Sequence, residues 1–312
     1  MYKFVISTSS FDTDNNPAIQ RLIQAGLQPV TNPFGRRLTE DEAGSLLEDD
    51  VVGMIAGIEP LTARVIQSAK NLKVISRCGT GMDSVDQTAA KNHGVTVLNT
   101  PEAPAQAVAE LTMGLMLAGL RQIPQTDQLI RNGEWPRTQG GLLAAQTVGV
   151  IGLGHIGKRV ARLCQAFEAR VIACDPLVKQ APENIALMPL DQLLETADII
   201  SLHTFYSPEL HHLIDTQALA RMKPGALLIN AARGGLIDEQ ALKDALDCGK
   251  LGAAALDTFE QEPYQGPLLE CKNLVLSSHV GSLAREARQR MELEAADNLL
   301  KGLIEAGVIN DT

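Results

Sequence analysis

Short apolar runs alternate along the whole chain with longer segments in which apolar residues recur at helical spacing. In the first third, four runs rich in Val and Ile predict β-strands at 3–8, 51–57, 72–77 and 95–99. Amphipathic patterns between them predict helices at 17–26, 39–48, 62–70 and 83–92. Strands and helices in this order are typical of a parallel sheet that carries helices on both faces.

The same alternation begins again after a long helical segment that follows Asn99 and opens with proline-containing turns. Six further apolar runs predict strands at 147–154, 169–175, 197–203, 226–232, 252–259 and 273–278. The last pattern, 282–307, predicts a long, charged amphipathic helix. The expected fold class is therefore α/β with two doubly wound parallel-sheet domains, and the chain crosses from one to the other near 99–101. A cleft between the two sheets is the expected ligand site.

Length, charge and cysteine usage narrow the class of protein. A chain of 312 residues exceeds the usual size of one domain, which agrees with two. The formal charge of −10 argues against nucleic acid or an anionic membrane as the main partner, although local cationic groups can still bind small anions. Five cysteines without a CxxC pattern indicate reduced thiols. With no signal-peptide pattern and no apolar run of membrane-spanning length, we expect a soluble cytoplasmic protein.

A glycine-rich loop follows the strand at 147–154. The motif is Gly152-x-Gly154-x-x-Gly157, and it lies between an apolar strand and a helix, as a dinucleotide-binding loop requires. Gly152 permits a tight turn, Gly154 lets a pyrophosphate approach the backbone, and Gly157 lets helix and strand pack closely. Asp175 ends the next strand, where its carboxylate can accept from adenosine ribose hydroxyls and repel a 2′-phosphate. The motif predicts NAD rather than NADP; the alternative is a purely structural turn with a surface aspartate.

Three polar residues lie near the ends of later strands in the same half of the chain. They are Arg233, Glu262 and His279. The carboxyl ends of strands are where a doubly wound sheet binds its ligand. Arg233 can hold a substrate carboxylate and carbonyl oxygen with two N–H donors. His279 can donate a proton to the carbonyl oxygen, and Glu262 can orient the imidazole and favour its charged form.

The segments "GLGHIG", "INAARGGLIDEQAL", "ALDTFEQEP" and "SSHVGS" closely resemble the D-isomer-specific 2-hydroxyacid dehydrogenases, in particular the phosphoglycerate dehydrogenase-like group. The resemblance implies that Arg233, Glu262 and His279 are the catalytic residues. It implies a Rossmann dinucleotide-binding domain at 100–284 and a flavodoxin-like substrate domain formed by 1–99 plus 285–312. It also implies NAD as cofactor, no metal, a small carboxylate substrate, and a homodimer formed through 100–145.

The resemblance further implies which residues contact cofactor and substrate. Asp257 and the 231–232 backbone are expected at the nicotinamide carboxamide, and His203 and Thr204 are expected beside the dinucleotide. The full expected cofactor set is Gly152, Gly154, His155, Ile156, Gly157, Asp175, His203, Thr204, Ala231, Arg233, Asp257, His279 and Gly281. The expected substrate set is Arg77, Thr80, Gly81, Arg233 and His279, with Thr80 and Gly81 contributing backbone amides and Arg77 facing the distal substrate group.

Several positions depart from the family pattern and leave the substrate open. Ala284 and Phe205 replace a usual Thr and Pro, and Pro104 and Ala105 stand where phosphoglycerate-type members often have Asn and Ser. The substrate could be 3-phosphoglycerate, glyoxylate or hydroxypyruvate, or a sulfonated or branched hydroxy acid. A different class, an NAD-sensing binding protein like the co-repressors of this fold, also keeps the three residues.

Other residues that stand out in the sequence have simpler interpretations. Arg77 could equally be solvated or paired in a salt bridge. Cys78 is expected to be a small loop hydrophobe, and Trp135 is expected to pack between subunits or domains. His203, His211 and His212 resemble turn and surface residues.

Overall fold

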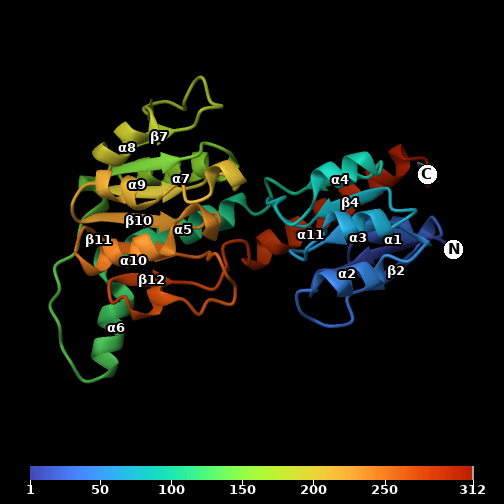
Figure 1. The fold of residues 1–312 in the computed structure, drawn as a ribbon, viewed down its shortest axis with the longest axis horizontal. Helices are drawn as coiled ribbons and strands as arrows, with labels where there is room; N and C mark the ends of the chain where they lie inside the picture. Colours follow the sequence, from blue (N-terminus) through green and yellow to red (C-terminus); the bar gives the residue numbers. More distant parts are fainter. Residues whose placement is uncertain (311–312) are drawn as a thin grey trace. The chain divides into compact units, whose positions relative to one another are not determined.

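The computed structural model describes residues 1–310 and divides the chain into two compact units (Figure 1). Unit 1 comprises Met1–Pro104 together with the chain from Leu283 onward, and unit 2 comprises Ala105–Ser282. The units change over at 104/105 and 282/283, compared with 99/100 and 284/285 in the sequence analysis. Each unit is built on one parallel sheet, which confirms the predicted α/β fold class.

Unit 1 contains a five-stranded sheet with helices on both faces. The strand order is β2 (Gln28–Thr31), β1 (Lys3–Ile6), β3 (Val51–Ala56), β4 (Val74–Arg77) and β5 (Thr96–Asn99). Apolar residues of α1 (Pro17–Gln24) and α11 (Arg285–Glu305) form one core layer. The other layer comes from α2 (Glu40–Leu46), α3 (Ala63–Ser68) and α4 (Gln87–Asn92).

The last long helix, α11, packs tightly on the central strands of unit 1. A Cβ atom added to Gly53 of β3 would lie 2.6 Å from Leu299 of α11. One added to Gly302 would lie 2.9 Å from Val74 of β4. Glycine at these two positions lets the helix approach the sheet, so residues distant in sequence complete the core of unit 1.

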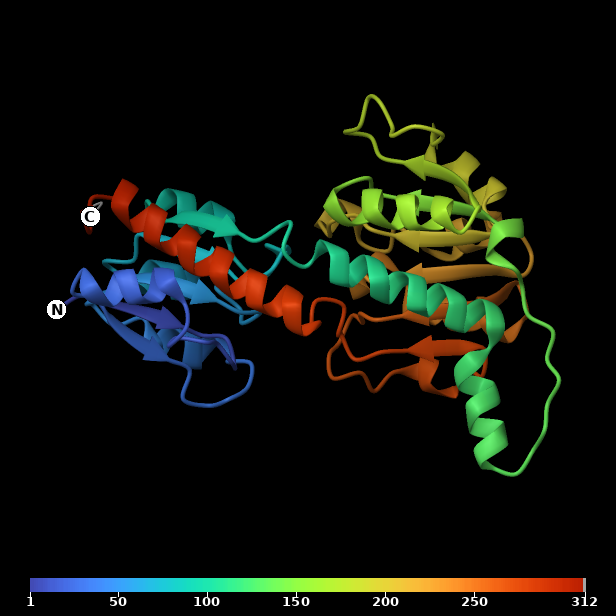
Figure 2. The ribbon, with the colours of Figure 1, turned by 180° about the vertical axis from the view of Figure 1, so that it is seen from behind.

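Unit 2 contains a seven-stranded parallel sheet. Its order is β12 (Leu274–Leu276), β11 (Leu251–Leu256), β10 (Ala226–Asn230), β9 (Ile199–Leu202), β6 (Thr147–Ile151), β7 (Arg170–Cys174) and β8 (Ala186–Leu187). Figure 2 shows α5 (Ala105–Arg121) and α7 (His155–Ala166) lying across one face of this sheet. The opposite face is covered by α8 (Leu190–Thr196), α9 (Thr216–Arg221) and α10 (Glu239–Asp247). Short 3₁₀ turns are η1 (Leu143–Ala145), η2 (Pro208–Leu210), η3 (Gly234–Leu236) and η4 (Pro267–Glu270).

Strands β2 and β8 and helix α6 are among the elements that were not predicted from the pattern. Strand β2 is an edge strand of sequence QPVT with no buried residue, so it has neither an apolar run nor an alternation. Strand β8 has only two residues. Helix α6 (Ile123–Arg131) follows Gln122, whose φ of 51° interrupts α5, and Pro124 lies in its first turn.

One predicted helix begins later than expected. Helix α4 starts at Gln87 because Asp86 caps it, its side chain accepting from Ala89 N, and residues 83–86 precede the helix. Among residues 1–310, no helix combines the length and the apolar character that a membrane span needs.

Candidate active site

The glycine-rich loop joins β6 to α7, and no side chain caps the first turn of that helix. Gly152 has φ of +94°, and a Cβ there would lie 2.6 Å from the carbonyl oxygen of His203. A Cβ on Gly157 would collide with the carbonyl oxygen of Gly152. Gly154 is different: it is the N-cap of α7, makes no side-chain cap, and has open space where a Cβ would stand. The first N–H groups of α7 have no partner within the helix, so this N-terminus fits an anionic group such as a pyrophosphate.

Asp175 is held beside that loop by backbone amides. Its Oδ2 accepts from Leu153 N at 2.7 Å, and its Oδ1 accepts from Leu177 N at 2.9 Å. Both bonds orient the carboxylate next to the turn that carries Gly152 and Gly154. A carboxylate in this place fits the ribose hydroxyls of an adenine dinucleotide.

His203 is not a surface residue, contrary to its sequence-based interpretation. The residue follows β9, donates its backbone N–H to Ile151 O at 2.7 Å, and lies against Gly152. Its Nε2 is 2.8 Å from Ser201 Oγ, and its Nδ1 is buried without a hydrogen-bond partner among the described residues. Burial lowers the pKa of His203 to about 3. The ring is therefore neutral at physiological pH, and the residue packs against the glycine loop at Gly152 and Gly157.

Glu262 and His279 form a directly hydrogen-bonded pair. Glu262 follows β11 and His279 follows β12, so both come from the carboxyl ends of neighbouring strands. His279 Nδ1 lies 2.8 Å from Glu262 Oε2, and Phe259 N donates to Glu262 Oε1 at 3.1 Å. Burial tends to raise the pKa of Glu262, but the bond from His279, its charge, the Phe259 amide and the charge of Arg233 together hold that pKa below its usual range. The ionised carboxylate fixes Nδ1 and leaves Nε2 as the nitrogen for proton transfer.

Arg233 follows β10 in a turn shaped by a buried asparagine and a glycine. Asn230 ends the strand, donates to Arg233 O at 2.8 Å and accepts from Ala232 N at 3.0 Å. Arg233 Nη1 donates to Ala232 O at 2.7 Å. A Cβ on Gly234 would collide with the backbone of Phe259, so glycine lets the segment leading to Glu262 pass beside Arg233. Asn230 was not predicted as a functional residue; the only signal for it in the sequence is that a polar residue closes the apolar run "ALLIN".

Asp257 positions the loop that carries His279. Its Oδ1 accepts from Val280 N at 2.9 Å and from Ser277 Oγ at 2.6 Å, and its Oδ2 accepts from Gly281 N at 2.8 Å. His279 itself has φ of 54° and donates its backbone N–H to Asp257 O at 2.8 Å. These bonds hold an otherwise disfavoured backbone conformation in place. The expected contact of Asp257 with a carboxamide stays a prediction.

The remaining expected cofactor residues lie in the same part of unit 2. His155 and Ile156 are the first two residues of α7, and Thr204 N would be 2.8 Å from a Cβ on Gly152. Ala231 directly follows β10. The structure thus gathers the whole expected cofactor set, with Arg233, Glu262 and His279, at the carboxyl edge of the seven-stranded sheet.

The expected substrate residues of unit 1 follow β4. Arg77 is its last residue, is buried, and donates from Nη1 to Cys78 O beneath Gly79. Burial raises the pKa of Cys78 to about 11, consistent with a packed hydrophobe rather than a nucleophile. Asn99 Nδ2 donates to Thr80 O at 2.8 Å, which braces the loop containing Thr80 and Gly81. The substrate contacts of Arg77, Thr80 and Gly81 stay predictions.

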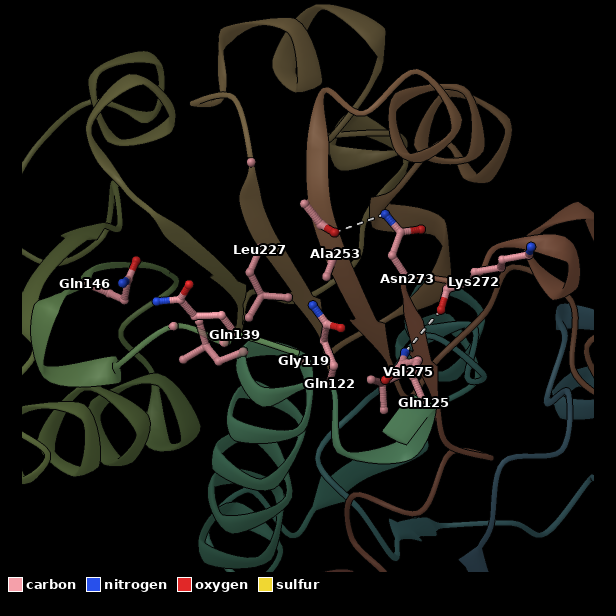
Figure 3. A pocket seen from close by; sticks show the side chains of 15 residues that line it. Gly119, Gln122, Gln125, Gln139, Gln146, Leu227, Ala253, Lys272, Asn273 and Val275 are labelled. Carbon is pink, nitrogen blue, oxygen red and sulfur yellow. Dashed lines mark hydrogen bonds between the residues drawn. The ribbon is translucent and has the colours of Figure 1, made fainter. Parts of the chain in front are cut away.

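A cavity of about 500 Å³ lies at the opposite edge of the same sheet. It is lined at the amino ends of β10, β11 and β12 and by the end of α5, with several glutamine side chains around it (Figure 3). No expected catalytic or cofactor residue lines it. The candidate active site and this cavity are therefore separate features of unit 2.

The fold and this strand-end site define a dinucleotide-binding α/β protein. The sequence profile of the D-isomer specific 2-hydroxyacid dehydrogenase NAD-binding domain matches residues 113–281. The chain belongs to this family, which confirms the resemblance and the expected NAD-binding domain.

Individual relatives agree with this assignment. The chain is 40% identical over 283 residues to D-3-phosphoglycerate dehydrogenase of Methanocaldococcus jannaschii, covering 88% of this chain and 54% of that protein. It is 38% identical over 272 residues to hydroxypyruvate reductase of Thermotoga maritima, covering 85% of this chain and 89% of that protein. The solved structure of a glyoxylate reductase from Paecilomyes thermophila superposes with a TM-score of 0.88 at 30% identity, covering 98% of this chain and 96% of that one. The chain thus spans about half the length of the first of these relatives and most of the other two.

Proposed function

We propose that this protein is an NAD-dependent D-2-hydroxyacid dehydrogenase, which transfers a hydride between nicotinamide and C2 of a 2-hydroxy or 2-oxo acid. The observation that carries the proposal is the Glu262–His279 pair beside Arg233, next to an open helix N-terminus suited to a pyrophosphate. These groups supply an acid, an anion-binding cation and a dinucleotide cradle within one unit.

The residues divide the work of carbonyl reduction between them. Arg233 donates to the substrate carboxylate and carbonyl oxygen and holds the plane of the substrate. His279 gives its Nε2 proton to that oxygen as the hydroxyl forms, and Glu262 stabilises the charged imidazole before the transfer. The bound nicotinamide supplies the hydride. In the oxidative direction His279 accepts the hydroxyl proton instead.

The cofactor form follows from Asp175. Its carboxylate is fixed at the end of β7 and repels a 2′-phosphate, so NADH is the preferred reduced cofactor. We expect kcat/KM to be higher with NADH than with NADPH, and Asp175→Ala to narrow the difference. Equal values for the wild-type protein would contradict this part of the proposal.

The substrate is a small 2-hydroxy acid, with 3-phosphoglycerate as the first candidate because several relatives are D-3-phosphoglycerate dehydrogenases. Hydroxypyruvate and glyoxylate are the second candidates, because the hydroxypyruvate reductase relative is matched over 89% of its length. The test is a panel of 2-oxo acids with NADH loss followed optically, together with NAD reduction by 3-phosphoglycerate. Turnover of none of these, with NADH still bound, would favour an NAD-sensing binding protein.

We also propose a cytoplasmic homodimer formed through 100–145. The five cysteines are all free, as in a reducing compartment. Helix α6 buries none of its residues, and Ile123, Ile130 and Trp135 nearby are exposed. Several exposed apolar side chains on one short segment of the chain favour a partner surface. A second copy of the chain would cover them.

A further inference from the structure

Two consecutive histidines and a glutamate form a cluster outside the candidate active site. One nitrogen of His211, one nitrogen of His212 and one carboxylate oxygen of Glu260 all lie within 4.8 Å of one another. The two imidazole rings stack with centroids 3.8 Å apart and planes inclined by 28°. His212 Nε2 directly contacts Glu260 Oε1. The hydride-transfer chemistry uses none of these side chains.

The backbone holds both sides of this cluster in place. His212 has φ of 55°, a region that few residues other than glycine adopt, and its N–H donates to Gly235 O at 2.9 Å. On the other side, Glu260 N donates to Glu239 Oε1 at 2.9 Å. The histidines and Glu260 are thus brought together by separate loops and do not merely neighbour each other in sequence.

The surroundings supply second contacts to the imidazoles and an excess of negative charge. Tyr206 Oη is 3.3 Å from His211 Nδ1, and Asp238 Oδ2 is 3.9 Å from His212 Nδ1. At 3.9 Å Asp238 is too far for a hydrogen bond to His212, but its negative charge beside the ring favours the approach of a cation. Glu239 Oε1 accepts from Glu260 N and so brings a further carboxyl group to the cluster. Three carboxyl groups therefore surround two imidazoles at one place.

We propose that His211, His212 and Glu260 form a binding site for a late first-row divalent cation such as Zn²⁺ or Ni²⁺. Two imidazoles and one carboxylate are the ligands these ions prefer, whereas Mg²⁺ and Ca²⁺ prefer oxygen alone. Ligand atoms at about 2.1 Å from a tetrahedral centre are about 3.4 Å apart, so a bound cation would move His212 Nε2 and Glu260 Oε1, which are in direct contact, apart by about 1 Å. It would also turn the two stacked imidazoles out of their nearly parallel arrangement, because each ring must aim an in-plane nitrogen lone pair at the ion. Water completes the coordination, because His211 and Glu260 are exposed.

The site would join loops that also lead to the candidate active site. Glu260 directly follows Phe259, whose N–H holds Glu262, and His212 is bonded to Gly235, two residues beyond Arg233. The cation therefore stabilises the folded state of unit 2. This inference does not depend on the proposed activity, because it needs only the fold of this unit.

The test is calorimetric titration of the metal-free full chain with ZnCl₂ and with NiCl₂, alongside melting temperature and NADH binding. We expect Zn²⁺ to raise the melting temperature of the wild-type protein. We expect His212→Ala and Glu260→Gln each to lower the affinity for one equivalent of Zn²⁺ at least tenfold. His93→Ala and Glu209→Gln are the matched controls, a histidine and a glutamate outside the cluster, and should titrate like wild type. Normal NADH binding shows that each variant is folded.

Two outcomes would overturn the proposal. One is a zinc titration of the His211→Ala/His212→Ala protein identical to that of the wild-type protein, which would place all bound zinc elsewhere. The other is Mg²⁺ binding as tightly as Zn²⁺ and with the same sensitivity to Glu260→Gln, which would indicate a carboxylate-only site. Absorption of the Co²⁺-loaded protein adds a direct readout, because imidazole coordination should change the spectrum only when both histidines are present.

Discussion

Arg233 contributes a shape as well as a charge. Its guanidinium already donates to Ala232 O and carries further N–H groups in the same plane, whereas a lysine ammonium is a point charge. We expect Arg233→Lys to raise KM for the 2-oxo acid and to lower kcat, because charge develops on the carbonyl oxygen in the transition state. The loss in kcat/KM should be roughly 10²–10³-fold, about 2.7–4 kcal/mol, as for one lost oxyanion donor.

The same preparation separates this role from a structural one. NADH affinity should remain close to wild type, since the Gly152–Gly157 loop provides the pyrophosphate site. A structural arginine would instead lower the melting temperature and leave the kinetics of the folded fraction intact. A wild-type kcat/KM in Arg233→Lys would contradict the assignment.

Glu262 sets the pH range of the proton transfer. Its lowered pKa means that it is ionised while it contacts His279, and the same contact favours the protonated imidazole. Glu262→Gln removes this negative charge, so the imidazole loses its proton at lower pH. We expect the alkaline limb of kcat/KM for reduction to move to lower pH in this variant.

Glu262→Gln has a matched control for its pH profile, and the lowered pKa of Glu262 also makes the stability of the folded protein depend on pH. Glu270→Gln, at an exposed glutamate in η4, should leave the limb unchanged. Because the folded pKa of Glu262 is depressed, its contribution to stability is present above the unfolded value and is lost as pH falls through the folded value. An alkaline limb that coincides in Glu262→Gln and wild type would show that the two groups are not coupled.

At the scale of one element, two glycines at the N-terminus of α7 have different roles: Gly154 is expected to matter for NADH binding, and Gly157 for folding. A Cβ on Gly154 meets open space, whereas one on Gly157 collides with Gly152 O. We expect Gly154→Ala to keep the wild-type melting temperature and weaken NADH binding about tenfold, about 1.4 kcal/mol, by filling the pyrophosphate cradle. Gly157→Ala should lower the melting temperature as well.

Fluorescence titration with NADH and thermal unfolding of both variants check this prediction. Alanine adopts the φ of −73° found at Gly154, so we expect the variant to fold normally. A weaker affinity for NADH would therefore report a changed binding site and not a damaged fold. Unchanged NADH affinity in Gly154→Ala would mean that the dinucleotide does not approach this backbone.

At the scale of the whole molecule, α6 and the segment after it expose apolar side chains that no residue among 1–310 covers. Trp135 is 81% exposed and Ile130 is 50% exposed. If a second copy covers them, Trp135→Ser combined with Ile130→Ser should convert the dimer to a monomer in sedimentation measurements. Leu269→Ser, at an exposed apolar residue of η4, is the control and should leave the mass unchanged. A monomeric wild-type protein would contradict the proposal.

The sequence by itself determined the two parallel sheets, the glycine loop and the three polar strand ends. These features depend on local patterns: apolar β-branched runs bury on both faces of a parallel sheet, and a glycine motif between strand and helix has few other uses. Arg233, Glu262 and His279 were found because each directly follows or closely succeeds such a run. Edge strand β2 and helix α6 were missed because neither buries an apolar stripe in its own unit.

Only the tertiary structure decided which of these residues touch. The Glu262–His279 bond joins the ends of two strands, and the Asp257 contacts with 277–281 close a loop whose residues lie about twenty positions away. Burial of the His203 ring results from the pairing of β9 with β6, which places Gly152 against it. The cluster of His211, His212 and Glu260 likewise requires two loops to meet. A linear pattern reports the neighbours of each residue along the chain, whereas hydrogen bonds and burial depend on neighbours that the packed sheet supplies.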